Sequence, residues 1–187
     1  MLVASIDVGT RNCALVVYDS VAHAVLAAEV VDLCRPTADA DADAAVVVVP
    51  VADQNVVYLC AAFVRARATV WAAVDVVAVE KQLSRRMLQV QYVLEAQLTA
   101  RGVEVLQVAP RSVKQHFGLL GRGNHAANKR RAVAAFTAML GPGGREQLCA
   151  RFPTKRDDVA DAVLQALFVA AKAPALRKKR GRACGLV

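Results

Sequence analysis

The sequence predicts an α/β domain built on a mixed five-stranded sheet with helices on both faces. Near the N-terminus, three apolar runs are separated by short polar segments, which is typical of strands joined by turns; they cover residues 2–7, 13–19 and 24–33. Two later apolar runs, at 74–79 and 103–108, each follow a stretch with helical spacing. We therefore expect the leading strands to be antiparallel and the later ones to pair in parallel through right-handed crossovers.

Four longer stretches carry apolar residues at helical intervals, at residues 52–70, 85–100, 126–140 and 157–171. Residues 110–117 fit one or two further helical turns, residues 46–49 fit either a strand or the approach to the first helix, and residues 35–43 form a polar loop. This order of elements is that of the ribonuclease H-like fold. We assign the fold to residues 1–172 and expect the basic segment 173–187 to be a flexible tail.

Composition argues against a membrane protein and against a disulfide-stapled one. The longest apolar run, residues 44–52, is far shorter than the roughly 20 residues of a spanning helix. The N-terminus lacks the basic start of a secretory signal. The five cysteines are widely spread and form no CxxC pair, so we expect reduced thiols and an intracellular, reducing compartment, either the cytoplasm or the nucleus.

The net charge of +8 is unevenly distributed along the 187 residues. Residues 1–80 carry 4 basic and 10 acidic side chains, whereas residues 81–187 carry 20 basic and 6 acidic ones. Basic residues spread for solubility would explain the total, but clusters at 129–131 and 177–180 favour a polyanionic partner. The charge pattern therefore indicates a protein that binds nucleic acid.

Acidic residues stand at places where the predicted elements converge. Asp7 and Glu80 end two strands that can be neighbours, and Asp158 and Asp161 share one face of the last helix. Taken singly, these acids also suit a turn, a loop or a helix start, and we assign Asp157 to the N-cap of that helix. Taken together, clustered carboxylates need a cation, and Mg²⁺ prefers carboxylate ligands. Two such ions support phosphodiester cleavage.

The chain resembles a known family in four segments that occur in the family's order and spacing. The RuvC-like Holliday junction resolvases share the segments SIDVGTRNCALVVYD, VAVEKQLSRR, NKRRAVAAF and KRDDVADAVLQA. The branch from poxviruses and related large DNA viruses is the most similar, and the fungal mitochondrial resolvases are similar too. The match spans roughly residues 3–170, and the DDVAD and E-x-Q blocks are more specific than IDVGT.

The resemblance implies a nuclease that resolves four-way DNA junctions. It implies a homodimer that nicks two strands symmetrically, with two Mg²⁺ ions in each site and Mn²⁺ as a substitute. The metal-binding and catalytic acids would be Asp7, Glu80, Asp158 and Asp161. Gln82 and Lys129 match further catalytic positions of the family.

Several basic residues are candidates for contacts with DNA phosphates. Arg85 and Arg86 follow the E-x-Q block, although an exposed helix start explains them nearly as well. Lys129, Arg130 and Arg131 form the basic start of a later helix. Their charge suits the phosphate backbone, which carries no sequence information by itself.

Other functions remain compatible with parts of this pattern. IDVGT followed by VVYD also resembles the phosphate-binding hairpin of actin-like ATPases and sugar kinases, but those proteins need a second lobe that this chain lacks. A ribonuclease H-like nuclease acting on flaps or RNA–DNA hybrids would use the same acids. A non-catalytic nucleic-acid-binding module is disfavoured, because clustered negative charge repels phosphate.

Overall fold

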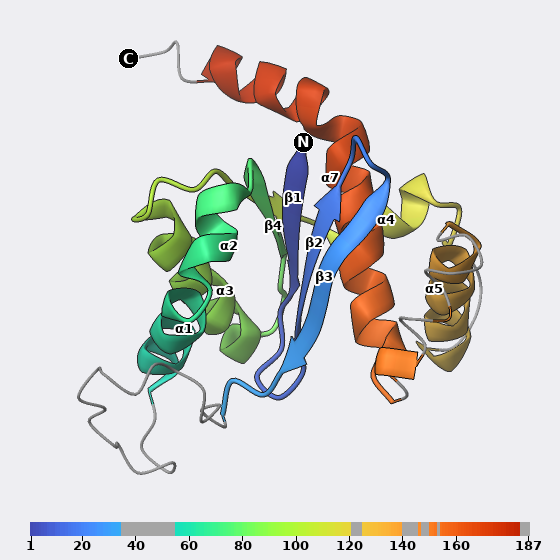
Figure 1. Ribbon diagram of the computed structural model, residues 1–187, viewed down its shortest axis with the longest axis horizontal. Helices are drawn as coiled ribbons and strands as arrows, with labels where there is room; N and C mark the ends of the chain where they lie inside the picture. The colour runs from blue at the N-terminus through green and yellow to red at the C-terminus, as the bar shows by residue number, and fades with distance from the viewer. Residues whose placement is uncertain (35–54, 121–124, 140–145, 147–149, 153, 184–187) are drawn as a thin grey trace.

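The computed structural model describes residues 1–34, 55–120, 125–139, 146, 150–152 and 154–183 (Figure 1). The polar loop expected at 35–43 and the ambiguous segment 46–49 lie outside the described residues.

A single mixed sheet forms the centre of the structure, with the strand order β3-β2-β1-β4-β5. Its strands are β1 (Leu2–Asp7), β2 (Cys13–Asp19), β3 (Ala24–Val31), β4 (Val76–Glu80) and β5 (Val105–Val108). The first three strands are antiparallel, whereas β1 pairs in parallel with β4, and β4 with β5. The predicted five-stranded arrangement is therefore confirmed, including the pairing that brings the first and fourth strands together.

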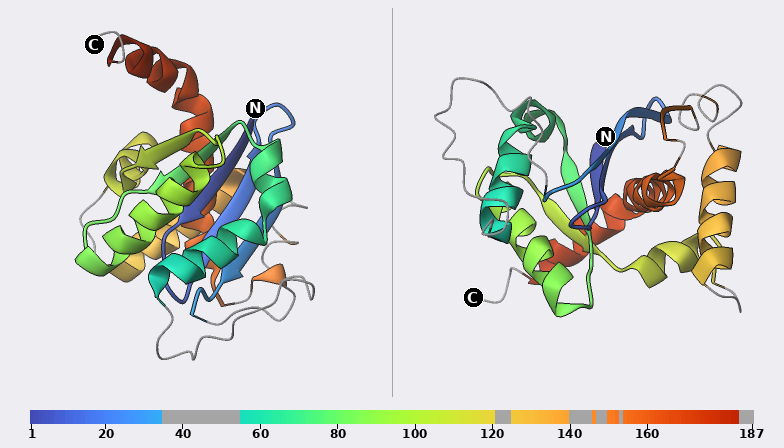
Figure 2. Two further views of the ribbon diagram at one scale, coloured as in Figure 1. Left: turned by 90° about the vertical axis from the view of Figure 1, so that its left-hand side faces the viewer. Right: turned by 90° about the horizontal axis from the view of Figure 1, so that it is seen from below.

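Helices cover both faces of this sheet, as predicted (Figures 1 and 2). One face is covered by α1 (Val56–Arg65), α2 (Ala68–Ala73) and α3 (Arg85–Thr99). The other face is covered by α7 (Arg156–Ala183), with α4 (Pro110–His116) and α5 (His125–Met139) packed beside it. None of the helices in the described part of the chain is long and apolar enough to cross a bilayer.

The helix predicted over residues 52–70 is two helices, and this correction has a physical cause at Arg67. The guanidinium of Arg67 donates to the backbone carbonyl of Phe63 at 3.0 Å and to the carboxylate of Glu29 on β3 at 2.8 Å. The indole N–H of Trp71 donates to the Val64 carbonyl at 2.7 Å. Side chains thus satisfy carbonyls at the end of α1, and the chain turns there instead of continuing one helix.

The last helix is longer than predicted. We expected it to end at residue 171, but α7 continues to Ala183 and its axis bends in the C-terminal part (Figure 1). Apart from Pro174, residues 172–183 are mainly Ala, Leu, Lys and Arg, which are good helix formers. The predicted end of the last helix was therefore wrong, whereas the flexibility expected of segment 173–187 stays a prediction.

Strand alternation directs the acidic strand ends toward α7. On β1, Ala4 and Ile6 pack in the core under α1–α3, whereas Val3 packs in the core under α7. The fourth strand alternates in the same way, with Val77 and Val79 in the first core and Val76 and Ala78 in the second. Continuing each alternation by one step places Asp7 and Glu80 on the α7 side of the sheet.

Candidate active site

Asp7 and Glu80 stand next to each other at the ends of two parallel neighbours. The pairing of β1 with β4 matches Ile6 with Val79, one residue before each acid. Burial raises the pKa of Asp7 well above its ordinary value, and the charge of Glu80 and a hydrogen bond between the two carboxyl groups raise it further. The Asp7 carboxyl therefore keeps its proton to a higher pH than an exposed aspartate does.

The turn after Asp7 depends on a glycine. A Cβ atom on Gly9 would lie 2.4 Å from the backbone carbonyl oxygen of Asn12, which is closer than real Cβ contacts allow. The tight approach returns the chain from β1 into β2 directly beyond Asp7. Gly9 therefore shapes the hairpin that holds the acid at the strand end.

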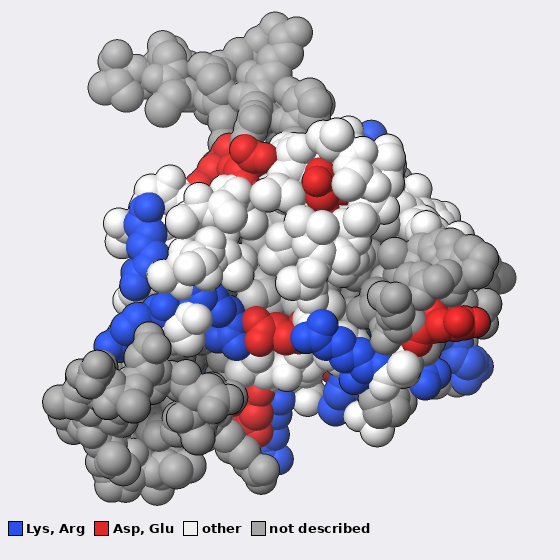
Figure 3. Space-filling model, viewed as in Figure 1, with Lys and Arg blue, Asp and Glu red and all other residues white. Residues whose placement is uncertain are grey.

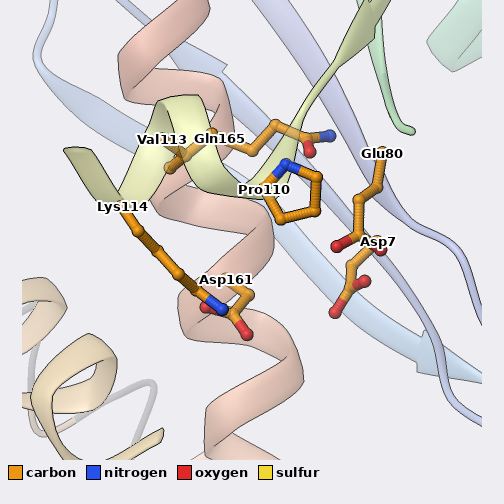
Figure 4. A pocket seen from close by; sticks show the side chains of 7 residues that line it. All are labelled: Asp7, Glu80, Pro110, Val113, Lys114, Asp161 and Gln165. Atoms are coloured by element: carbon orange, nitrogen blue, oxygen red, sulfur yellow. The ribbon is translucent and has the colours of Figure 1, made fainter. Parts of the chain in front are cut away.

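The acids of α7 face the strand ends. Asp161 lines the same pocket as Asp7 and Glu80, from the opposite side (Figure 4). Burial raises the pKa of Asp161, and the positive charge of Lys114 partly opposes this rise. Asp158 lies one turn earlier on α7 and does not line the pocket, but its charge contributes to the raised pKa of Asp7. Burial also raises the pKa of Asp158 itself.

The pocket has a third side, which α4 supplies. Pro110, Val113 and Lys114 line it, and the ammonium group of Lys114 points toward Asp161 (Figure 4). Lys114 was not among the residues predicted from the sequence. The topology could have identified Lys114. Because β4 and β5 are parallel, both strands end at the same edge of the sheet, and α4, which carries Lys114, follows β5 directly.

The carboxyl groups fit a hard divalent cation in their chemistry, although they are not grouped as a finished site. Among the described residues, no three His, Cys, Asp or Glu side chains already form a metal-binding cluster. Asp7 and Glu80 turn toward each other, and Asp161 faces them across the pocket (Figure 4). The oxygen-only donor set is the kind that Mg²⁺ and Mn²⁺ bind. A buried carboxyl group beside a second acid is also an arrangement in which a bound cation would favour the charged form of both groups.

Gln82 lies beside Glu80, and a chain of polar side chains supports it. The side-chain amide nitrogen of Gln82 donates to the Glu80 carboxylate, and the backbone N–H of Gln82 donates to the side-chain oxygen of Gln91 at 2.7 Å. Gln91 is 1% exposed and in turn donates to Glu95 at 2.7 Å, which accepts from Gln107 at 2.8 Å. Gln91 was missed from the sequence, although a polar residue within the apolar stripe of a helix was the available signal.

Lys129 lies outside the pocket, paired with Asp157. Its ammonium group donates to the Asp157 carboxylate, and this bond raises the pKa of Lys129, with smaller contributions from Asp158 and Asp161. Burial is the largest single influence and alone would raise the pKa of Asp157. The bond to Lys129, a hydrogen bond from the Asp157 backbone N–H and the charges of Lys129 and Lys155 together outweigh it, so the pKa is lowered. Asp157 is not the N-cap that we expected, because α7 begins at Arg156 and Asp157 lies within the first turn.

The other basic candidates lie on the surface at two separate places. Arg85 and Arg86 are exposed in the first turn of α3, shortly after Glu80. Arg130 is exposed on α5, and Arg131 is partly buried and contacts the Leu119 carbonyl at 3.5 Å. On the face drawn in Figure 3, Lys and Arg side chains form a band that acidic side chains interrupt. The basic half of the sequence therefore does not produce an unbroken positive face in this view.

Comparison with known proteins identifies similar sequences and folds. The family model of the poxvirus A22 protein matches residues 1–172. No curated protein sequence matches the chain significantly.

Three solved structures have the same fold at low sequence identity. The fowlpox virus resolvase, solved with substrate Holliday junction DNA, is 17% identical, with a TM-score of 0.63 over 92% of this chain and 99% of that one. Thermus thermophilus RuvC in complex with a Holliday junction substrate is 23% identical, with a TM-score of 0.58 over 94% and 96%. The yeast mitochondrial Holliday junction resolvase Ydc2 is 14% identical, with a TM-score of 0.61 over 99% and 86%. These likenesses and the strand order confirm the predicted ribonuclease H-like fold.

Proposed function

Because the chain belongs to the poxvirus A22 protein family, we propose that it is a Holliday junction resolvase, an endonuclease that hydrolyses one phosphodiester bond on each of two strands of a four-way DNA junction. The observation that carries this proposal is the meeting of Asp7, Glu80 and Asp161 in one pocket. The similarity to resolvases solved with junction DNA supports the choice of substrate. The basic second half of the chain supports a nucleic-acid partner.

We propose that the site works with Mg²⁺, with Mn²⁺ as a substitute, held by carboxylates from three elements. The ligands would be Asp7 from β1, Glu80 from β4, and Asp158 and Asp161 from α7. A pair of divalent cations bound there would supply Lewis acidity, which lowers the pKa of water and neutralises charge on a phosphate. Four carboxylates around two cations would also relieve the repulsion that raises the pKa of Asp7.

The chain's own residues prepare the site for this chemistry. Because the pKa of Asp7 is raised, its carboxyl must lose its proton before it can act as a ligand. The Gln82 amide, which donates to Glu80, holds that carboxylate in one orientation. Lys114 projects a positive charge into the pocket, where a scissile phosphate would develop negative charge.

Lys129, Arg85 and Arg86 would bind the DNA backbone around the pocket. Lys129 lies close enough to Asp158 and Asp161 for their charges to raise its pKa, so it stands at the rim of the site. Arg85 and Arg86 are exposed in the first turn of α3, where the positive end of the helix dipole adds to their attraction for phosphate. Such contacts position a junction without reading its sequence.

We propose that a homodimer places two such pockets on opposite strands of the junction. Selectivity for junctions then follows from the spacing of two pockets and from the shape of branched DNA.

The free thiols of Cys13, Cys34 and Cys60 support the expected reducing compartment.

The decisive experiment incubates the protein and Mg²⁺ with a labelled four-way junction, beside a linear duplex, a flap and an RNA–DNA hybrid. Glu80→Gln and Asp158→Asn serve as matched variants that keep size but remove charge. Paired symmetric nicks in the junction, lost in both variants while junction binding persists, are the expected result. Preferential cleavage of the flap or the hybrid would replace the resolvase function with that of another nuclease. Tight junction binding without cleavage in Mg²⁺ or Mn²⁺ would refute an enzymatic function.

A further inference from the structure

Gln165 is a polar side chain buried between α7 and the sheet, with only 4% of its surface exposed. Its side-chain nitrogen lies 3.2 Å from the carbonyl oxygen of Ile6, 3.1 Å from that of Ala78 and 3.0 Å from the hydroxyl of Ser5. Carbonyl oxygens can only accept, so the side chain must present its NH₂ group to them. Three acceptors therefore share two amide hydrogens.

The carbonyl acceptors belong to the two strands that carry the acids of the pocket. Ile6 immediately precedes Asp7 on β1, and Ala78 lies two residues before Glu80 on β4. One amide group thus bridges both acid-bearing strands close to their acidic ends. A shift of either strand relative to Gln165 would break a hydrogen bond inside the core, where an unpaired polar group is costly.

Gln165 also follows Asp161 by four residues on α7, so the two side chains lie on the same face of the helix. The adjacent residues Leu164 and Ala166 are buried and apolar. Apolar packing of this kind is non-directional and would hold α7 on the sheet at a range of positions along the strands. The hydrogen bonds of Gln165 are directional, and they select one of those positions.

We propose that Gln165 is a positioning residue that sets the distance between Asp161 and the pair of Asp7 and Glu80, and thereby the affinity of the pocket for divalent cations. The inference rests on the proposed metal-dependent function. Gln165 also lines the pocket of the three acids (Figure 4). Its amide nitrogen is engaged by Ser5, Ile6 and Ala78, so we assign it the placement of the acids and no direct contact with a cation. Residues that orient metal ligands in this way typically change metal affinity or activity by about 10- to 100-fold when they are replaced.

The test measures the Mg²⁺ concentration dependence of the melting temperature for the full chain, without DNA. Gln165→Met keeps the length of the side chain but cannot donate a hydrogen bond. Val163→Ala is the matched control, because Val163 is also buried on α7 but packs in the core that β2 and α5 share. Both variants are expected to lower the melting temperature of the metal-free protein, since each disturbs the packing of α7.

Gln165→Met is expected to weaken the apparent Mg²⁺ affinity by about 10-fold or more, and Val163→Ala to leave it unchanged. Equal Mg²⁺ affinity in Gln165→Met and the wild type would overturn the positioning role of Gln165 and leave the proposed metal site intact. No Mg²⁺-dependent stabilisation in the wild type would refute the metal site itself, and the positioning role with it. If Gln165→Met does not fold, Gln165→Asn takes its place with the same expectation, because its amide is one methylene too short to reach all three acceptors.

Discussion

The side-chain carbonyl oxygen of Gln91 accepts a hydrogen bond from the backbone N–H of Gln82 at 2.7 Å. Gln91 belongs to α3 and is buried, whereas Gln82 belongs to the loop that follows Glu80. The bond therefore connects a rigid helix to the segment whose amide holds the Glu80 carboxylate. Because Gln91 also donates to Glu95, both ends of its amide group are occupied.

Replacing Gln91 with Leu should lower both stability and junction cleavage. The change leaves the Gln82 N–H without its acceptor and Glu95 without one of its donors, at a cost of about 1–3 kcal/mol for a buried unsatisfied group. Chemical denaturation and the single-turnover cleavage rate measure the two effects. Gln89→Leu, the same substitution at an exposed position of α3, is the control. Wild-type cleavage by Gln91→Leu would show that the Gln82 loop needs no support from α3.

Asp7 should make the stability of the metal-free protein fall as the pH rises. In the folded protein, burial and Glu80 raise the pKa of Asp7 above its ordinary value of 3.8. Between that value and the raised pKa, the folded state binds more protons than the unfolded chain, so the free energy of unfolding decreases with pH. Asp7→Asn removes this contribution. The variant should be more stable than the wild type at neutral pH without metal, and the difference should vanish near pH 4.

Thermal melts in a chelating buffer, from about pH 4 to pH 8, measure this difference. Asp158 and Asp161 also have raised pKa values, so part of the pH dependence should persist in Asp7→Asn. A difference between the two proteins that does not change with pH would contradict the raised pKa of the buried Asp7 carboxyl.

The fold and the convergence of the acids were predictable because both follow from local periodicity. Short apolar runs of strand length located β1 and β4, and the parallel crossover made them neighbours. Asp7 and Glu80 are the terminal residues of those strands, so their proximity required no knowledge of side-chain contacts. The spacing of Asp158 and Asp161 on a helix was equally visible in the sequence.

The missed features depend on contacts between residues far apart in the chain. Gln165 donates a hydrogen bond to Ser5, which lies 160 residues earlier in the chain. Arg67, just beyond the end of α1, pairs with Glu29 on β3. Nothing in the immediate neighbourhood of either residue indicates its partner. The pairing of Asp157 with Lys129 is a contact of the same kind. Asp157 was expected to be an N-cap, but it lies within α7 and its carboxylate binds Lys129.

Asp157 and Asp158 are neighbours in sequence but should respond differently to the same substitution. Asp157 pairs with Lys129, and both side chains are partly exposed, so the pair should contribute no more than about 1 kcal/mol. Asp158 is a proposed metal ligand. Asp158→Asn should therefore reduce the cleavage rate by more than about 100-fold, the consequence of losing several kcal/mol of metal-assisted stabilisation. Asp157→Asn should retain most of the activity.

Cleavage rates at saturating Mg²⁺ and melting temperatures of both variants test this contrast. Equal losses of activity would mean either that Asp157 is itself a ligand or that Lys129 must be held by it for catalysis. Lys129→Met separates these two cases, because only the second predicts a matching loss in that variant.

Lys114→Met should slow cleavage without weakening junction binding. Lys114 lines the pocket and points toward Asp161, so its charge is placed for a phosphate that occupies the pocket and not for the surrounding DNA backbone. Removing one preorganised group that stabilises developing charge typically costs about 10²- to 10³-fold in rate. Single-turnover rates and equilibrium binding to a labelled junction measure the two quantities separately. Arg111→Met, at an exposed position of the same helix, should leave the rate at saturation unchanged. A Lys114→Met variant that binds more weakly yet cleaves at the wild-type rate once saturated would assign Lys114 to DNA binding instead.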